Sequence, residues 1–217
     1  MPEPTPKPKQ REPFNLFKFT RNAIIIAAVI GLTVWFVVVG VVPNVFPKNF
    51  GVVEAGSIYR SGKLTPAAFR KVINEREIKT IVDFGAWEPG TREDRRAQRV
   101  ADAMGVDRIV FDLEGDATGD PAQYLEALRI VNDTANHPIL VHCGAGSERT
   151  GCFFMLYRTI VQDEPVDEAF EEAQDFRHDP NRNPKMRPTF DAIRGPIEDA
   201  FESGGELVAP EGGWGAG

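Results

Sequence analysis

The strongest hydrophobic pattern in this 217-residue chain is an unbroken apolar run near its beginning. Residues Ala23 to Val42 hold 20 positions without a charged side chain. A helix rises about 1.5 Å per residue, so a run of this length matches the roughly 30 Å hydrocarbon layer of a bilayer. The run therefore predicts one N-terminal transmembrane helix over 23–42. A cleaved signal peptide is the main alternative, although no small-residue cleavage site follows the run.

Beyond residue 50 the apolar positions form short runs that alternate with stretches of helical periodicity. Thr65 with Pro66 and Asp120 with Pro121 mark two helix starts, and Thr91 marks a third. The short apolar runs predict strands at 57–61, 79–84, 108–111 and 139–142. We expect helices after Thr65, Thr91 and Asp120, over 150–161, and near 166–177 and 189–202.

Alternating strands and helices predict an α/β fold with a mostly parallel central sheet flanked by helices. Binding sites in such sheets form beyond the carboxyl ends of the strands. We therefore expect the segment that follows the strand at 139–142 to form a site. The expected organisation is a disordered cytoplasmic tail over 1–22, the transmembrane helix over 23–42, one α/β domain over 52–203 and a disordered tail over 204–217.

Charge is distributed unevenly on the two sides of the apolar run. Residues 1–48 carry six basic and two acidic side chains, whereas the remainder carries 19 basic and 30 acidic ones, a net charge of −11. The basic residues before the run favour a cytoplasmic amino terminus, which places the following domain outside the cytoplasm. An acidic domain lacks the clustered Lys and Arg of a nucleic-acid groove, so we expect no nucleic-acid partner.

The chain has two cysteines, Cys143 and Cys152, which are too few for a disulfide scaffold. No Cys/His cluster has zinc spacing, so we expect neither a metal nor a cofactor. Cys152 lies among apolar residues and is expected to pack as a small hydrophobic side chain. Cys143 lies among glycines, where a thiol is better placed to react.

A candidate phosphate-binding loop joins the last predicted strand to an apolar helix. It reads Val141-His142-Cys143-Gly144-Ala145-Gly146-Ser147-Glu148-Arg149-Thr150-Gly151. Backbone amides and the amino end of the helix can direct positive charge into one hollow, and Arg149 can hold two phosphate oxygens. The same groups favour the thiolate form of Cys143, which can attack phosphorus. The residues expected to bind the substrate are Gly144, Ala145, Gly146, Ser147, Glu148 and Arg149.

The loop resembles the signature loop of the cysteine-dependent protein tyrosine phosphatase superfamily, through His142-Cys143-x-x-Gly146-x-x-Arg149-Thr150-Gly151. The segment from Ile58 to Leu64 is similar to the opening strand of the atypical dual-specificity branch, including its bacterial members. The resemblance covers roughly residues 52–180 and implies metal-free hydrolysis of phosphate monoesters on an α/β fold. It also implies that Cys143 is the nucleophile, Arg149 the phosphate clamp, Thr150 a hydroxyl donor to the leaving thiolate and His142 a residue that tunes the cysteine.

The family takes a proton for the leaving group from an aspartate about 30 residues before the cysteine. Asp112 lies 31 residues before Cys143 and Asp116 lies 27 residues before it, so both are candidates, with Asp112 the first choice. Asp120 is better explained as a helix cap. The loop departs from relatives with very acidic inositol substrates because it contains no lysine, and Glu148 precedes its arginine.

These patterns predict a membrane-anchored phosphatase that acts on phosphotyrosine, phosphoserine or phosphothreonine in proteins, or on a similar small phosphate ester, through a phosphocysteine intermediate. The alternative is a catalytically weak phosphate-binding module that recruits a phosphorylated partner at the membrane. A rhodanese-like sulfur transferase also uses a cysteine loop, but the ending Arg149-Thr150-Gly151 argues against it. The basic, proline-broken segment over 177–187 is expected to be a solvated surface loop.

Overall fold

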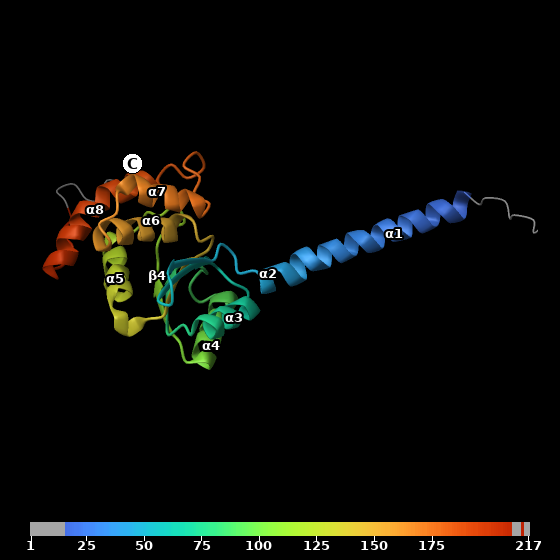
Figure 1. Cartoon of the computed structure of the whole chain (residues 1–217), viewed down its shortest axis with the longest axis horizontal. Coiled ribbons are helices and arrows are strands. Elements are labelled where there is room, and N and C mark those ends of the chain that lie inside the picture. The colour runs from blue at the N-terminus through green and yellow to red at the C-terminus, as the bar shows by residue number, and fades with distance from the viewer. Residues whose placement is uncertain (1–15, 210–213, 215–217) are drawn as a thin grey trace, which may run out of the picture. The chain divides into compact units, whose positions relative to one another are not determined.

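The structure is a computed structural model that describes residues 16–209 and residue 214 (Figure 1). It divides into two compact units, Met1–Val42 and Pro43–Gly217. The predicted tail over 1–15 lies outside the described residues, as do 210–213 and 215–217. The α/β domain expected over 52–203 falls within the second unit.

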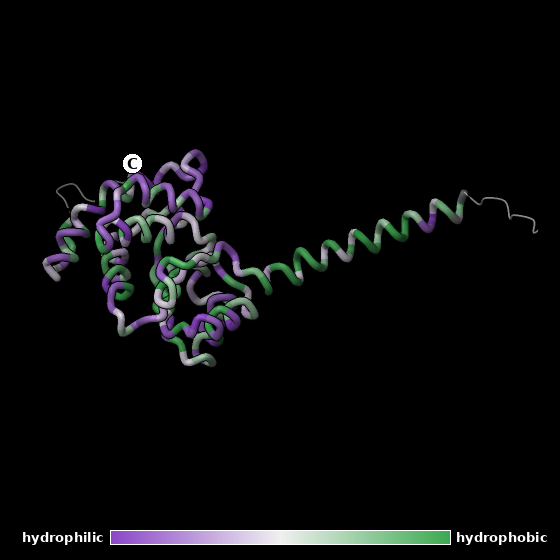
Figure 2. The backbone as a smooth tube through the Cα atoms, viewed as in Figure 1, coloured by the Kyte–Doolittle hydropathy of each residue, from purple (hydrophilic) through white to green (hydrophobic). Residues whose placement is uncertain are grey.

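The first unit contains one long helix, α1 (Leu16–Phe36), which continues as a π-helical turn (Val37–Val41); the short helix α2 (Val42–Val45) follows, and all of it but Val42 belongs to the second unit. The continuous helical stretch Phe19–Val45 is long and apolar enough to cross a membrane, and none of it is buried within the chain. Figure 2 shows apolar residues along most of its length. Residues 16–22 are helical and not a disordered tail, since extending a nucleated helix adds one hydrogen bond for each residue fixed.

The second unit is built on a five-stranded sheet in the order β1-β2-β5-β3-β4. The strands are β1 (Gly51–Glu54), β2 (Ile58–Gly62), β3 (Thr80–Phe84), β4 (Asp107–Phe111) and β5 (Ile139–Cys143). β1 pairs antiparallel with β2 and the other neighbours pair parallel, which confirms the mostly parallel sheet. β1 is missing from the sequence prediction because its four residues are too few to show a strand period.

Helices cover both faces of the sheet (Figure 1). The helices are α3 (Pro66–Arg76), α4 (Arg92–Met104), α5 (Pro121–Asn132), α6 (Glu148–Leu156), α7 (Val166–Asp175) and α8 (Met186–Ser203). Neighbouring strand residues alternate between the two cores: Leu140 belongs to the core with α3 and α4, and Val141 belongs to the core with the other four helices. A 3-10 turn (Thr134–Asn136) precedes β5, and a π-helical turn (Tyr157–Val161) extends α6.

The predicted helix starts are confirmed by their caps. Thr65 Oγ1 accepts a hydrogen bond from Ala68 N–H, Thr91 Oγ1 does so from Asp94 N–H, and Asp120 Oδ1 does so from Ala122 N–H. These bonds satisfy amides that have no partner inside the first helical turn. The sequence therefore places three helices correctly from local chemistry alone.

The chain beyond α8 differs from the expected free tail. Leu207 and Trp214 are partly buried and pack against the core on the α5–α8 side of the sheet. The helix ends at Ser203, where Gly204 adopts a left-handed conformation with φ +66°. Glycine adopts this conformation without the steric cost that a Cβ atom imposes, so it ends the helix and turns the chain back toward the core.

Candidate functional site

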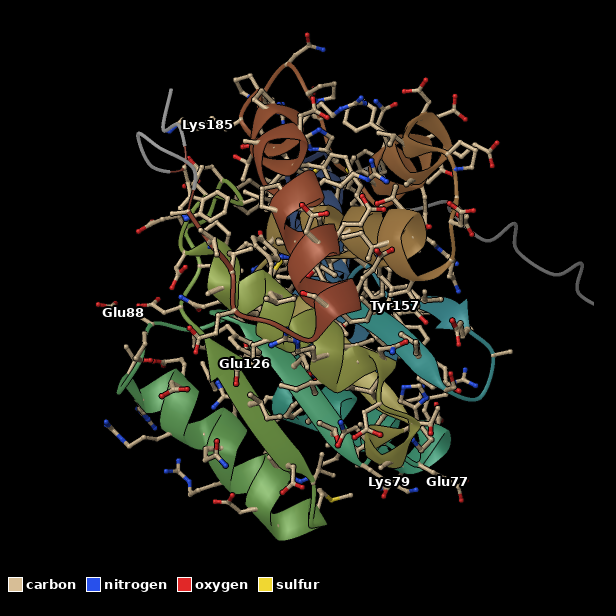
Figure 3. All side chains as sticks on the ribbon, turned by 90° about the vertical axis from the view of Figure 1, so that its left-hand side faces the viewer. Glu77, Lys79, Glu88, Glu126, Tyr157 and Lys185 are labelled. Atoms are coloured by element: carbon tan, nitrogen blue, oxygen red, sulfur yellow. The ribbon has the colours of Figure 1, made fainter. Side chains whose placement is uncertain are left out.

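The candidate loop lies at the carboxyl edge of the sheet, as its position after β5 predicts. β5 is paired on both sides, with Gly62 of β2 opposite Cys143 and Asp83 of β3 opposite His142. Figure 3 labels Lys79, which precedes β3, and Glu88, which follows it, at two ends of the domain. The loop is on the Glu88 side, where the parallel strands β2, β3 and β4 also have their carboxyl ends.

Cys143 is buried at the base of this loop, with 1% of its surface exposed. Its Sγ accepts a hydrogen bond from Gly146 N–H at 3.2 Å. Gly146 has φ +77°, and a Cβ atom there would lie 2.6 Å from the nitrogen of Gly62. Only glycine allows the loop to pass this close to β2 while directing its amide at the sulfur.

Arg149 is anchored through one end of its guanidinium group. Nη1 donates hydrogen bonds to the carbonyl oxygens of Gly85 at 2.7 Å and Leu113 at 3.2 Å. Its Nε is buried without a hydrogen-bond partner among the described residues, and Nη2 would lie 3.3 Å from a Cβ atom on Gly144. The edge formed by Nε and Nη2 is therefore beside the loop, in the arrangement that binds two oxygens of a phosphate group.

Thr150 and His142 flank the cysteine from α6 and β5. Thr150 Oγ1 is buried and has no hydrogen-bond partner in the described part of the chain. His142 packs edge-on against Trp87, with ring centroids 5.6 Å apart, and its Nε2 lies 3.5 Å from Asp83 Oδ2. Burial lowers the pKa of His142 against the opposing effect of Asp83, so its imidazole is neutral near pH 7.

Asp83 positions the turn that holds Arg149. Its Oδ1 accepts a hydrogen bond from Ala86 N–H at 2.7 Å, and the intervening Gly85 supplies the carbonyl that Arg149 contacts. Arg108 donates two hydrogen bonds to Asp83 Oδ2, at 3.0 and 2.7 Å. Sequence reasoning missed both residues. The sequence does carry one signal for this pair: Asp83 places a carboxylate inside the apolar run of β3, and a buried charge requires a partner.

Arg60 lies under the loop with its side chain completely buried. Its Nη2 donates to Gly146 O at 3.3 Å, and its guanidinium lies 3.8 Å from the centre of the Phe176 ring. Burial lowers the pKa of Arg60 to about 10, against the effect of Glu172, whose Oε1 is 3.4 Å from Nη1. The group thus stays charged near pH 7, and it too is absent from the sequence prediction.

Both oxygens of the Glu148 carboxylate are engaged on the side of the basic segment. Oε2 is 2.8 Å from His178 Nδ1, and Oε1 accepts a hydrogen bond from Asn183 Nδ2 at 2.9 Å. His178 is 4% exposed, so this part of the 177–187 segment is packed and not a solvated loop. Glu148 thereby joins the candidate loop to the segment before α8, with both of its carboxylate oxygens hydrogen-bonded inside the protein.

The two candidate proton donors lie on the turn that follows β4. Asp112 is exposed, and its main chain is held by Gln123, which accepts from Asp112 N–H at 2.7 Å. Asp116 accepts hydrogen bonds from Thr118, and its Oδ2 is 3.1 Å from Lys185 Nζ. Hydrogen bonding from Thr118, with the charge of Lys185, lowers the pKa of Asp116. The contact between Arg149 and Leu113 places this turn beside the cysteine loop.

A groove of about 270 Å³ lies next to the loop, between α3 and α4. Lys63, Trp87 and Arg96 are among its lining residues. Lys63 N–H donates to Gly144 O at 3.2 Å, and Trp87 contacts His142, so the groove adjoins the site. The groove presents an apolar wall, the two cations and the carboxylate of Glu93 beside the loop.

Cys152 is separate from this chemistry. It is completely buried in α6, and both cysteines are free thiols. Burial raises the pKa of Cys152 to about 12, so its thiol stays protonated and packs as the hydrophobic side chain that the sequence predicts. Among the described residues, no group of three His, Cys, Asp or Glu side chains could hold a metal ion.

Comparison with known proteins places the chain among phosphatases. The model of a family described as the tyrosine phosphatase family matches residues 44–192. The inositol diphosphatase DSP3 of Arabidopsis thaliana is 36% identical over 121 residues, which are 52% of this chain and 55% of the relative. The dual specificity protein phosphatase TpbA of Pseudomonas aeruginosa is 30% identical over 119 residues, 54% of this chain and 50% of the relative. The chain thus spans about half the length of these curated relatives.

A solved structure gives the same result for the fold. The core catalytic domain of the PP-IP phosphatase SIW14 from S. cerevisiae is 28% identical, with a TM-score of 0.53. The match covers 60% of this chain and 76% of the yeast domain. The sheet and its flanking helices are therefore those of cysteine-dependent phosphatases.

Proposed function

Because this chain belongs to the tyrosine phosphatase family, we propose that it is a cysteine-dependent phosphatase that hydrolyses phosphate monoesters. The observation that carries the proposal is the relation of three groups in one loop. Cys143 Sγ accepts a hydrogen bond from Gly146 N–H, and Arg149 Nε beside them has no hydrogen-bond partner among the residues that the structure describes. A phosphate bound by loop amides and by that edge has the sulfur directly below phosphorus.

In the proposed reaction, the Cys143 thiolate attacks phosphorus and the bond to the leaving-group oxygen breaks. Asp112 or Asp116 donates a proton to that oxygen, and the phosphoryl group remains on the sulfur as a phosphocysteine. Water then attacks phosphorus, the same carboxylate accepts a proton from the water, and the thiolate leaves as inorganic phosphate forms. Thr150 Oγ1, buried and unpaired in the described structure, donates a hydrogen bond to the departing thiolate.

The substrate that we propose carries a single phosphate group on a protein side chain or a similar ester. The binding loop contributes no lysine, and Glu148 is paired with His178 and Asn183, so the loop itself offers one cation, Arg149. One guanidinium and a set of amides neutralise one phosphate dianion well. The groove lined by Trp87 supplies apolar contact for the remainder of the substrate.

A second candidate substrate is an inositol diphosphate. Two observations favour it: the similarity to an inositol diphosphatase, and a lysine outside the loop whose ammonium reaches it. Lys48 Nζ lies 3.0 Å from Gly144 O. Together with Lys63 and Arg96 of the groove, this lysine adds positive charge around the single cation of the loop.

We also propose that the helix over Phe19–Val45 anchors the enzyme in a membrane, with the amino terminus in the cytoplasm. The support is the length of the helix, the exposure of its apolar side chains, and the five basic residues before the apolar run. A reporter fused after Gly217 tests the orientation. A reporter active only outside the cytoplasm is expected to give signal, and one active only inside is expected to give none.

The decisive experiment compares wild type with Cys143→Ser and Arg149→Met on a panel of phosphate esters. The panel contains an aryl phosphate, a phosphotyrosyl peptide, a phosphoseryl peptide and an inositol diphosphate. Cys143→Ser should abolish phosphate release while the protein stays folded, and Arg149→Met should weaken binding and turnover together. Turnover that survives in Cys143→Ser would refute the mechanism. A wild-type protein that binds phosphopeptides without hydrolysing any ester would favour the phosphate-binding module.

A further inference from the structure

We propose that Asn49, in the segment that follows the apolar helix, is a positioning residue for the phosphate-binding loop. The inference rests on the proposed function, since it concerns how the loop is made ready for an oxyanion. Asn49 is half-buried and lies in the unit that begins at Pro43. Its side chain reaches the loop from a point 97 residues earlier in the chain.

The argument starts from the orientation of peptide groups in the loop. The C=O of one residue and the N–H of the next point in opposite directions in a trans peptide. Among the described residues only His137–Pro138 is cis, so the loop peptides are trans. A donor that holds a loop carbonyl from outside therefore turns the following N–H toward the inside of the loop, where an oxyanion would bind.

Three consecutive loop carbonyls are held from outside in this way. Lys48 Nζ and Lys63 N–H donate to Gly144 O, at 3.0 and 3.2 Å. Asn49 Nδ2 is 2.9 Å from Gly146 O and 3.5 Å from Ala145 O, so it spans two of the three carbonyls. The following amides, of residues 145–147, are thereby directed inward. The Gly146 N–H does point inward, because it is hydrogen-bonded to Cys143 Sγ.

Asn49 is suited to this position in two respects. Its φ of +49° is left-handed, a conformation that asparagine tolerates better than most residues with a side chain. Its amide nitrogen carries two hydrogens, which are directed at Gly146 O and at Phe176 O, each 2.9 Å away, and the longer contact to Ala145 O at 3.5 Å shares one of them. Lys48 O, one residue earlier, accepts from Gly62 N–H at 2.8 Å and fixes the segment to β2.

Aspartate has the shape of asparagine but no donor, so it would place a carboxylate against two carbonyl oxygens. Asn49→Asp should turn the loop peptides away from their inward orientation, with the fold otherwise kept. Asn49→Gly keeps the left-handed backbone and removes the side chain, which separates the hydrogen bonds from backbone strain. Asn136→Asp is the matched control: Asn136 Nδ2 donates to Ile130 O at 2.8 Å, in the turn that precedes β5 at the opposite end of the strand.

The test measures tungstate binding by calorimetry, kcat and KM on an aryl phosphate, and the melting temperature, all in the full chain. We expect both Asn49 variants to bind tungstate about tenfold more weakly or worse, since a loop amide turned away from the inside no longer donates a charge-assisted hydrogen bond to the oxyanion. We expect Asn136→Asp to change the melting temperature without changing tungstate affinity. A folded Asn49→Gly that binds tungstate as wild type does would overturn the proposal.

Binding and turnover report on separate claims. If wild type binds tungstate but hydrolyses no ester, the proposed phosphatase activity is wrong, and the tungstate data still decide the role of Asn49. If wild type hydrolyses esters and the two Asn49 variants match it in affinity and kcat, the activity stands and the positioning role is wrong.

Discussion

Asp83 and Arg108 form a buried ion pair, in which Arg108 Nη2 lies 2.7 Å from Asp83 Oδ2. Their side chains are 0% and 2% exposed. The pair matters to the site because Asp83 also holds the turn whose Gly85 carbonyl anchors Arg149. The buried ion pair and the anchor of Arg149, the proposed phosphate clamp, therefore share Asp83.

Arg108→Met should destabilise the domain strongly, because it leaves the Asp83 carboxylate buried and without its cation. Breaking a buried pair in this way costs about 3–5 kcal/mol. The measurement is the free energy of unfolding from urea denaturation. Arg187→Met is the control, since the Arg187–Asp191 pair is on the surface and should contribute less than about 1 kcal/mol. Equal losses in the two variants would contradict this account.

Asp112→Ala and Asp116→Ala distinguish the two candidate proton donors. The true donor should matter most for an alkyl phosphate, whose alkoxide leaves poorly without a proton, and least for an activated aryl phosphate. The measurement is kcat/KM on the two substrates for each variant. A donor that acts alone should cost on the order of 10²–10⁴-fold on the poor leaving group. Equal effects on both substrates would exclude that aspartate.

Lys185→Met gives an independent test of Asp116 through the pH profile. Figure 3 shows Lys185 just before α8, and its charge helps to lower the pKa of Asp116. Removing it should raise that pKa and extend the protonated form of the acid to higher pH. The alkaline limb of kcat should then move upward if Asp116 is the donor. The limb stays in place if Asp112 is the donor.

His142 should make stability fall on mild acidification. Burial lowers its folded pKa below the ordinary value of 6.5, so the unfolded chain binds more protons below that pH. The free energy of unfolding therefore rises with pH in this window. The stabilising contribution of the neutral His142 is present above about pH 6.5 and is lost as the pH falls from there toward the folded pKa. His142→Gln should flatten the change in urea midpoint between about pH 7.5 and pH 5.5. An unchanged slope would assign the acid sensitivity to other groups.

Cys152→Ala should retain turnover, because Cys152 is completely buried and its thiol stays protonated. The substitution removes one buried sulfur and should cost about 1 kcal/mol of stability. Steady-state kinetics and urea denaturation measure the two effects. Loss of turnover at an unchanged melting temperature would reveal a role for this thiol that its environment does not suggest.

The boundaries of most elements could be predicted because their signals are local. The caps at Thr65, Thr91 and Asp120 act within one helical turn, and the apolar run before Cys143 places a strand ahead of the loop. The signal fails for β1, which is too short, and for the chain after Ser203, where Leu207 packs into a core built by distant helices. Packing of that kind has no period in the sequence.

Local sequence patterns were enough to predict the strand-loop-helix order around Cys143. They also predicted the candidate chemistry of the loop, since its thiol, its glycine amides and Arg149 lie within a few residues of one another. What supports that loop depends on the order of strands in the sheet. Asn49, Arg60 and Asp83 precede β5 by many residues and reach the site only because β2 and β3 flank β5. Hydrogen bonds between distant segments form only after folding has brought those strands together, so tertiary structure alone selects these partners.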